Sequence, residues 1–218
     1  NTDISEAQLA RLIGLPDAPT IIDVSIDEDF AADPRLIPTA MRRDYRHVAQ
    51  WGPEFAGKNV VIVCHRGKKL SQGVAAWLRQ MAIQAETLQG GFVAWRDAGN
   101  LLVNLAALPA YDAAGRTVWV TRARPKVDRI ACPWLIRRFV DPAAVFLFVA
   151  PAEVEAVAER FGATPFDVEG VYWSHRDERC TFDTMVAEFG LSTEPLERLA
   201  TIVRAADTNR LDLAPEAA

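Results

Sequence analysis

The stretch from residue 60 to residue 89 constrains the fold of this chain more than any other. It begins with "VVIV" at 60–63, four residues typical of a buried strand, and it closes with "AETLQ" at 85–89, which is typical of a second strand. Between them, "LSQGVAAWLRQMA" at 70–82 places apolar residues at helical spacing. Two neighbouring strands joined through a helix form a right-handed parallel unit. The stretch therefore predicts an α/β fold with a parallel sheet flanked by helices.

A cysteine stands where the first of these strands passes into the helix, in "CHRGKKLS" at 64–71. Open α/β sheets bind their ligands at the carboxyl ends of the strands. A curled loop directs backbone N–H groups inward, and the helix that follows adds its positive end, so an anion or a thiolate is stabilised there. Cys64 is the candidate nucleophile. The candidate anion-binding residues are His65, Arg66, Gly67, Lys68 and Lys69.

The alternative is that Cys64 is simply a small apolar residue at the end of a buried strand. Four basic or imidazole side chains follow it within five residues. Burying such side chains beside an inert thiol would cost free energy. We therefore favour the reactive loop.

The apolar residues between 100 and 116 follow neither helical nor strand spacing, and Pro109 and Gly115 interrupt the segment. We predict a first domain at 1–105, a linker at 106–116 and a second domain at 117–218. The second domain is expected to be a smaller, helix-rich α+β domain. Its predicted strands are 117–123, 146–149 and a strand or hairpin at 168–175; its predicted helices are 131–142, 151–162, 182–190 and 194–207.

The second domain carries candidates for a further site. Cys132 precedes Pro133, so it could be a helix N-cap with a lowered pKa beside Arg129, but we favour a small core cysteine on the "IACPWLI" face. "SHRDERC" brings His175, Glu178 and Cys180 together. A metal or small-oxyanion site could use His175, Glu178 and Asp207. The spacing matches no zinc signature, so satisfied surface or core residues are the alternative, and we assign no metal and no cofactor.

Composition excludes several classes of protein. The net charge is -5, and the three cysteines are too few and too widely spaced for a disulfide framework. The basic run from 116 to 138 lacks interleaved aromatic residues and a helix-turn-helix pattern, so salt bridges to acidic segments explain it better than DNA binding. No apolar run is long enough to span a membrane. We expect a cytoplasmic protein with no membrane partner, and the chain is expected to be a trimmed piece of a longer one.

Residues 20–99 resemble a rhodanese domain. The motifs that carry the resemblance occur in the family's order, as "IIDVS" (21–25), "LIPTA" (36–40), "CHRGKKLS" (64–71) and "LQGGFVAW" (88–95). The resemblance implies a sulfurtransferase in which Cys64 carries sulfane sulfur as a persulfide from a thiosulfate-like donor to a thiol or to cyanide. Lys69 stands where many members carry arginine; lysine keeps the charge and loses the planar fork, which leaves the preferred donor open. Ser25 and Thr39 also depart from the family pattern, where arginine and glycine are usual.

Residues 117–213 resemble the carboxyl-terminal domain of the bacterial chromate-resistance proteins called ChrB. The matching segments are "TRARPKVDRIACPWLIRRFVDP" (121–142), "PFDVEGV" (165–171), "SHRDERCTFD" (174–183) and "LATIVRAADTNRLDLAPEAA" (199–218). This resemblance implies a role in the response to chromate. The usual regulator's amino-terminal portion is replaced here by the rhodanese-like domain, which argues against DNA binding.

The sequence as a whole predicts an enzyme, a rhodanese-type sulfurtransferase linked to chromate or oxyanion stress. Its partners would be a small sulfur donor and a thiol acceptor, with chromate as an oxyanion ligand or only as the stress. The alternative is a chromate-responsive sensor or regulator, in which the rhodanese-like loop binds an oxyanion or reports the redox state.

Overall fold

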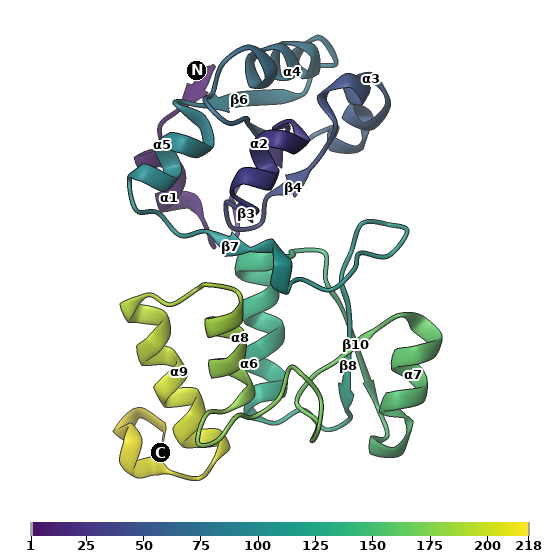
Figure 1. Ribbon diagram of the computed structural model, residues 1–218, viewed down its shortest axis with the longest axis vertical. Helices are drawn as coiled ribbons and strands as arrows, with labels where there is room; N and C mark the ends of the chain where they lie inside the picture. The colour runs from purple at the N-terminus through teal and green to yellow at the C-terminus, as the bar shows by residue number, and fades with distance from the viewer. Residues whose placement is uncertain (1, 218) are drawn as a thin grey trace. The chain divides into compact units, whose positions relative to one another are not determined.

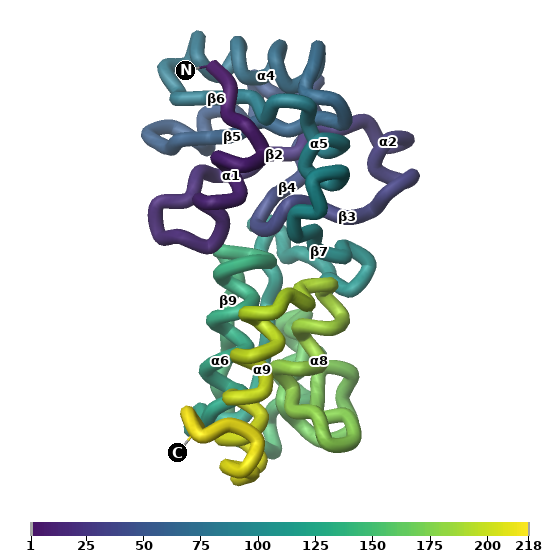
Figure 2. The backbone as a smooth tube through the Cα atoms, turned by 90° about the vertical axis from the view of Figure 1, so that its left-hand side faces the viewer, coloured from purple at the N-terminus to yellow at the C-terminus, as the bar shows by residue number. Residues whose placement is uncertain are grey.

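The computed structural model describes residues 2–217, and its chain divides into two compact units (Figures 1 and 2). The first unit ends at Ala106 and the second begins at Ala107. The division falls within the linker predicted at 106–116. The two units are of similar length, and each is described by itself.

The first unit is built on a five-stranded sheet in which every pairing is parallel. Its strands, in spatial order, are β1 (Asp3–Ile4), β6 (Gln84–Leu88), β5 (Asn59–Val63), β2 (Thr20–Asp23) and β4 (Met41–Arg42). A separate antiparallel pair joins β3 (Arg35–Leu36) to β7 (Val103–Asn104). In the centre of the large sheet Thr20 pairs with Val60 and Asp23 pairs with Val63, so the carboxyl ends of β2 and β5 are level with one another.

Helices cover both faces of this sheet. They are α1 (Glu6–Leu12), α2 (Asp27–Ala32), α3 (Val48–Trp51), α4 (Lys69–Gln80) and α5 (Gly91–Asp97). Successive side chains of a strand point to opposite faces, and β5 shows this directly. Val60 and Ile62 pack in a core with residues of α3 and α4, whereas Val61 and Val63 pack with residues of α1 and α5. Figure 2 shows α4 on one side of the sheet and α1 on the other.

The second unit contains a three-stranded parallel sheet in the order β10-β8-β9. The strands are β8 (Val118–Arg122), β9 (Val145–Val149) and β10 (Thr164–Pro165). The helices are α6 (Val127–Leu135), which continues as a π-helical segment at Ile136–Val140, α7 (Val154–Phe161), α8 (Thr181–Glu188) and α9 (Glu194–Asp207). The predicted mixed architecture, with a helix-rich second unit, is confirmed. The second unit is not the smaller of the two, however, and its sheet is parallel throughout, which the expected α+β class did not anticipate.

The two faces of the second sheet are covered differently. On one face Val120 packs against Val154 and Ala163, at the two ends of α7. On the other face Trp119 lies edge-on to Phe166 and Phe189. Helices α6, α8 and α9 pack against one another as a group, and Figure 1 shows this group on the side of β8 opposite to α7. The face of the sheet that carries Trp119 is therefore the one that lies toward the helix group.

Two predictions for the second unit are wrong. Residues 168–175 form turns rather than a strand or hairpin, because Asp167 and Gly170 both take positive φ angles and the Asp167 N–H donates to the Trp173 carbonyl, 2.8 Å away. Cys132 is not a helix N-cap, because α6 starts at Val127 and encloses it. The buried face of α6 includes two charged residues, Asp128 and Arg129. Because the helix was predicted from the spacing of apolar residues, its first turn was not recognised.

No helix within residues 2–217 combines the length and the apolar character that a membrane crossing requires.

Candidate functional site

Cys64 follows directly after β5, and α4 begins five residues later at Lys69. Its side chain is 5% exposed. The Cys64 thiol donates a hydrogen bond to Ser71 Oγ at 3.2 Å, and the Ser71 hydroxyl donates in turn to the Lys68 carbonyl at 3.1 Å. Ser71 is fully buried in the first turn of α4. The sulfur is therefore held against the amino terminus of a helix of twelve residues, where the helix dipole favours a negative charge.

Two glycines let the Cys64 loop lie against the start of α5. Gly67 and Gly91 have φ angles of 65° and 62°, which is the left-handed region. A Cβ atom on Gly91 would lie 2.1 Å from the Cys64 carbonyl oxygen, and one on Gly67 would lie 2.5 Å from the Leu88 carbonyl oxygen. The Phe92 N–H donates to the Cys64 carbonyl at 3.0 Å. The backbone of the loop is therefore fixed from both sides, and only glycine fits at these two positions.

The backbone N–H groups of Lys68, Lys69 and Leu70 donate to no protein acceptor within residues 2–217. They lie at the amino terminus of α4, where the first N–H groups of a helix have no partner in the helix itself. The side chains of Arg66, Lys68 and Lys69 are exposed around them, and His65 is half-buried. The loop therefore combines one buried sulfur, unpaired backbone N–H groups and exposed cations, a combination that suits an anion.

Asp23 lies at the end of β2, the strand next to β5, and is 3% exposed. Burial raises the pKa of the Asp23 carboxyl, and the Ser25 N–H, at 2.8 Å, acts in the opposite direction. The positive charges of Arg42 and His65 also lower this pKa. Asp23 therefore fixes the turn after β2 through the Ser25 N–H, and its charge interacts with that of His65 in the Cys64 loop.

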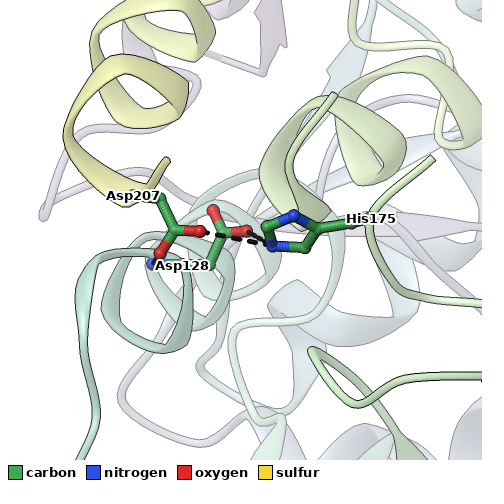
Figure 3. A group of neighbouring side chains, drawn as sticks. All are labelled: Asp128, His175 and Asp207. Atoms are coloured by element: carbon green, nitrogen blue, oxygen red, sulfur yellow. Dashed lines mark hydrogen bonds and ion pairs between the residues drawn. The ribbon is translucent and has the colours of Figure 1, made fainter. Parts of the chain in front are cut away.

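The second unit contains a cluster of carboxylates around one imidazole (Figure 3). Asp128 lies in the first turn of α6, His175 in the loop before α8, and Asp207 at the last position of α9. His175 Nε2 lies 3.3 Å from Asp128 Oδ2 and 3.2 Å from Asp207 Oδ2. One ligand atom from each of the three residues lies within 4.8 Å of the other two. We call these three residues the Asp–His–Asp cluster.

Asp128 is completely buried, and α8 holds its carboxylate in place. The backbone N–H of Thr181 donates to Asp128 Oδ2 at 2.6 Å, and that of Phe182 donates to Oδ1 at 3.4 Å. Burial, followed by the nearby negative charge of Asp207, raises the pKa of Asp128 to about 6. Asp128 therefore tends to take up a proton or to attract a cation.

A third aspartate, Asp167, lies beside the cluster but already has positive partners. Its Oδ1 is 3.4 Å from His175 Nε2. Its Oδ2 lies 3.1 Å from Arg129 Nε and 3.4 Å from Arg122 Nη2. The Arg129 contact is an ion pair without hydrogen-bond geometry. These arginines compensate the negative charge of Asp167. The negative charges of Asp128 and Asp207 face His175 instead.

Neither cysteine of the second unit is placed for thiolate chemistry. Cys132 and Cys180 are both fully buried. Burial raises the pKa of each thiol, and the negative charge of Asp128 raises both further. Arg129, predicted to lower the pKa of Cys132, pairs instead with Asp167. The structure shows Cys132 as a buried core cysteine, which is the interpretation that the sequence favoured.

The structure brings together some of the predicted second-site residues and not others. His175 and Asp207 meet, with Cys180 and Arg129 beside them. Glu178 is exposed and makes no contact with the cluster. Asp128 and Asp167 complete the site and are not among the residues predicted from the sequence. A signal existed for one of them, because Asp128 is the single acid in a run of seven bases at 116–138.

Comparison with known proteins finds similarities for both units of the chain. Residues 119–218 match the family model of the ChrB C-terminal domain. Among curated proteins, Protein ChrB of Cupriavidus metallidurans is 39% identical over 90 residues, which cover 41% of this chain and 26% of that protein. The chain therefore spans only about a quarter of that relative.

Several of the solved structures similar to this chain are named as rhodanese proteins. A rhodanese-related protein from Thermoplasma volcanium is 20% identical and covers 47% of this chain and 98% of its own, with a TM-score of 0.42. A rhodanese-like domain protein from Staphylococcus aureus is 26% identical and covers 44% and 91%, with a TM-score of 0.39. A thiosulfate sulfurtransferase from Pseudomonas aeruginosa is 23% identical and covers 47% and 19%, with a TM-score of 0.41.

Both resemblances noted in the sequence recur in these comparisons. Residues 119–218 match the ChrB C-terminal domain, and solved structures named as rhodanese proteins are similar to the first unit.

Proposed function

We propose that the first unit is a sulfurtransferase that carries sulfane sulfur as a persulfide on Cys64 and serves resistance to chromate or a related oxyanion stress. The observation that carries this proposal is the placement of Cys64. Its sulfur faces Ser71 at the start of α4, and the same loop carries exposed cations and backbone N–H groups that have no protein acceptor within residues 2–217. The similarity of the second unit to ChrB proteins supports the proposed link to chromate stress.

The proposed reaction is a double displacement. The Cys64 thiolate attacks the outer sulfur of thiosulfate, a new S–S bond forms, and the original S–S bond breaks as sulfite leaves with its electron pair. An acceptor thiolate then attacks the outer sulfur of the Cys64 persulfide and takes it, and the Cys64 thiolate leaves. The net change moves one sulfur atom from donor to acceptor and needs no external oxidant or reductant.

The loop residues have separate roles in this scheme. The N–H groups of Lys68, Lys69 and Leu70 are donors for the negative charge that both the thiolate and the persulfide carry. The Ser71 hydroxyl can turn from the Lys68 carbonyl toward the sulfur once the thiol proton has left, because the two heavy atoms are already 3.2 Å apart. Arg66, Lys68 and Lys69 are exposed and attract the anionic donor.

The test is to incubate the purified protein with thiosulfate and to measure the intact mass and the transfer of sulfur to a thiol or to cyanide. We expect a mass gain of one sulfur atom and turnover, both lost in Cys64→Ser. Cys180→Ser is the matched control, because serine is a favoured N-cap residue at the start of α8, and it should behave as the unsubstituted protein. If the unsubstituted protein gives neither persulfide nor turnover, the proposal is wrong.

A further inference from the structure

We propose that the Asp–His–Asp cluster of the second unit binds a divalent transition-metal ion of the zinc or manganese class, with His175 Nε2 and one carboxylate oxygen each from Asp128 and Asp207 as ligands. This site lies in the second unit, and it does not depend on the chemistry proposed for Cys64.

The first support is the set of distances. A metal ion held at about 2.1 Å by nitrogen and oxygen ligands places two ligand atoms about 3.0 Å apart at a right angle and about 3.4 Å apart at a tetrahedral angle. The distances from His175 Nε2 to Asp128 Oδ2 and to Asp207 Oδ2 are 3.3 and 3.2 Å, which lie between these values. Two of the three ligand pairs are thus already separated as ligands of one ion would be.

The second support is that hydrogen bonding does not explain the arrangement. An imidazole Nε2 carries one hydrogen at most, and its hydrogen bonds to oxygen are typically about 2.9 Å long. Here carboxylate oxygens of three aspartates lie 3.2 to 3.4 Å from the same nitrogen. Within residues 2–217, none of these contacts has hydrogen-bond geometry. The oxygens therefore lie close to His175 Nε2 without accepting a hydrogen bond from it. This is expected if Nε2 and two of the oxygens are ligands of one ion.

The third support is the local balance of charge. Among the described residues, neither Asp128 nor Asp207 forms an ion pair with lysine or arginine, whereas Asp167 next to them has two arginine partners. A buried carboxylate without a cation is costly. Asp207 also ends a helix of fourteen residues, where the dipole disfavours a negative charge. A divalent cation would compensate both carboxylates.

The ligand types select the class of ion. One imidazole and two carboxylates suit zinc and manganese, whereas magnesium prefers sites made wholly of oxygen. Two features leave room for exchange with solvent, since the His175 side chain is 41% exposed and that of Asp207 is 15% exposed. Asp128, held by two backbone N–H groups of α8, is the fixed ligand.

The test uses the full chain in a Cys64→Ser background, so that the thiolate of the first unit cannot bind the ion. The protein is stripped with a chelator, dialysed against Zn²⁺ or Mn²⁺ alone, and analysed for bound metal. We expect one ion per chain, lost in His175→Ala and in Asp207→Asn. Glu178→Gln is the matched control, because Glu178 is an exposed acid in the same loop and lies outside the cluster, so this variant should keep the ion.

A second measurement needs no substitution in the second unit, so it holds even if those variants fail to fold. The chain has three histidines, His47, His65 and His175. Bound Mn²⁺ should broaden the imidazole NMR signals of His175, and bound Zn²⁺, which is diamagnetic, should shift them without broadening. The proposal is overturned if neither ion binds at one per chain, if folded His175→Ala binds as well as the parent, or if the His175 signals do not respond.

Discussion

The Cys64 loop and the Asp–His–Asp cluster occupy equivalent places in two sheets and have opposite electrostatic character. Each lies where a parallel strand ends and a helix begins, β5 before α4 in one case and β8 before α6 in the other. The first combines free backbone N–H groups with exposed cations. The second combines two carboxylates with one imidazole, and a third carboxylate, that of Asp167, lies beside them.

The difference shows that the fold fixes the place of a site while the side chains fix its charge. The carboxyl edge of a parallel sheet offers a position where ligands can bind. In the first unit, Lys68 and Lys69 at the start of α4 make that position suited to anions. In the second unit, Asp128 in the first turn of α6 makes it suited to cations. Burial and the charge of Asp128 raise the pKa of the Cys132 and Cys180 thiols, whereas the Cys64 sulfur lies at the amino terminus of a helix.

The largest effect is expected from Gly91→Ala, which disturbs the first site alone. The new Cβ would lie 2.1 Å from the Cys64 carbonyl oxygen, at a φ angle of 62°. Overlap and left-handed strain together should cost about 3 kcal/mol of unfolding free energy, and sulfur transfer should be lost. Urea denaturation and a transfer assay measure the two effects.

Gly57→Ala is the control for that variant. Gly57 has a φ angle of 74° and nothing within 4 Å of its would-be Cβ. It should lose about 1 to 2 kcal/mol through strain alone and transfer sulfur normally. Equal loss of transfer in both variants would show that general destabilisation, and not the shape of the loop, controls the activity.

The next effect compares the cysteines themselves. Because burial and nearby carboxylates raise the pKa values of Cys132 and Cys180, less of each thiol is ionised at any given pH than in an ordinary cysteine. Between pH 7 and 9, iodoacetamide should therefore modify these two residues only after the protein is unfolded. Peptide mapping checks this. Rapid modification of Cys132 or Cys180 in the folded protein would remove the contrast between the two units.

A smaller effect is expected from Ser71→Ala, which removes the hydroxyl 3.2 Å from the Cys64 sulfur. A hydrogen bond to a charged group contributes about 1.5 kcal/mol, so formation of the persulfide should slow about tenfold. Gly73→Ala is a matched control in the same helix, with open space around the added methyl group. It should retain the rate. An unchanged rate in Ser71→Ala would exclude the hydroxyl from the chemistry.

The smallest effect is expected at Lys69, which is exposed. Removing its charge in Lys69→Met should weaken binding of the anionic donor by about threefold, with a weaker dependence on salt, whereas Lys69→Arg should keep both. The Michaelis constant for thiosulfate at low and high ionic strength measures this. If Lys69→Met and Lys69→Arg behave alike, the charge has no part in recognition.

The sequence predicts the first site better than the second because the first is local. The strands β5 and β6, the helix α4 and every residue of the Cys64 loop lie within one continuous stretch, so periodicity and motif order locate them. Helix α9 was also predicted with the bounds that it has, 194–207. Strands of two residues, such as β1 and β10, carry no periodic signal, and none of these was predicted.

The second site is assembled from residues far apart in the chain. His175 and Asp207 were candidates because of their residue types, but Asp128 joins them only through the packing of α6 against α8 and α9. Proximity in sequence favoured Glu178 over Asp128, and the tertiary structure reverses that choice. The sequence assigned no role to Asp128, and the structure shows that this residue is completely buried.

The most direct test of the contrast between the two units is to locate sulfane sulfur by peptide mass spectrometry after the folded protein has been treated with thiosulfate. We predict one additional sulfur atom on the peptide that contains Cys64 and none on those that contain Cys132 or Cys180. Sulfur on either cysteine of the second unit, or none on Cys64, would contradict the account.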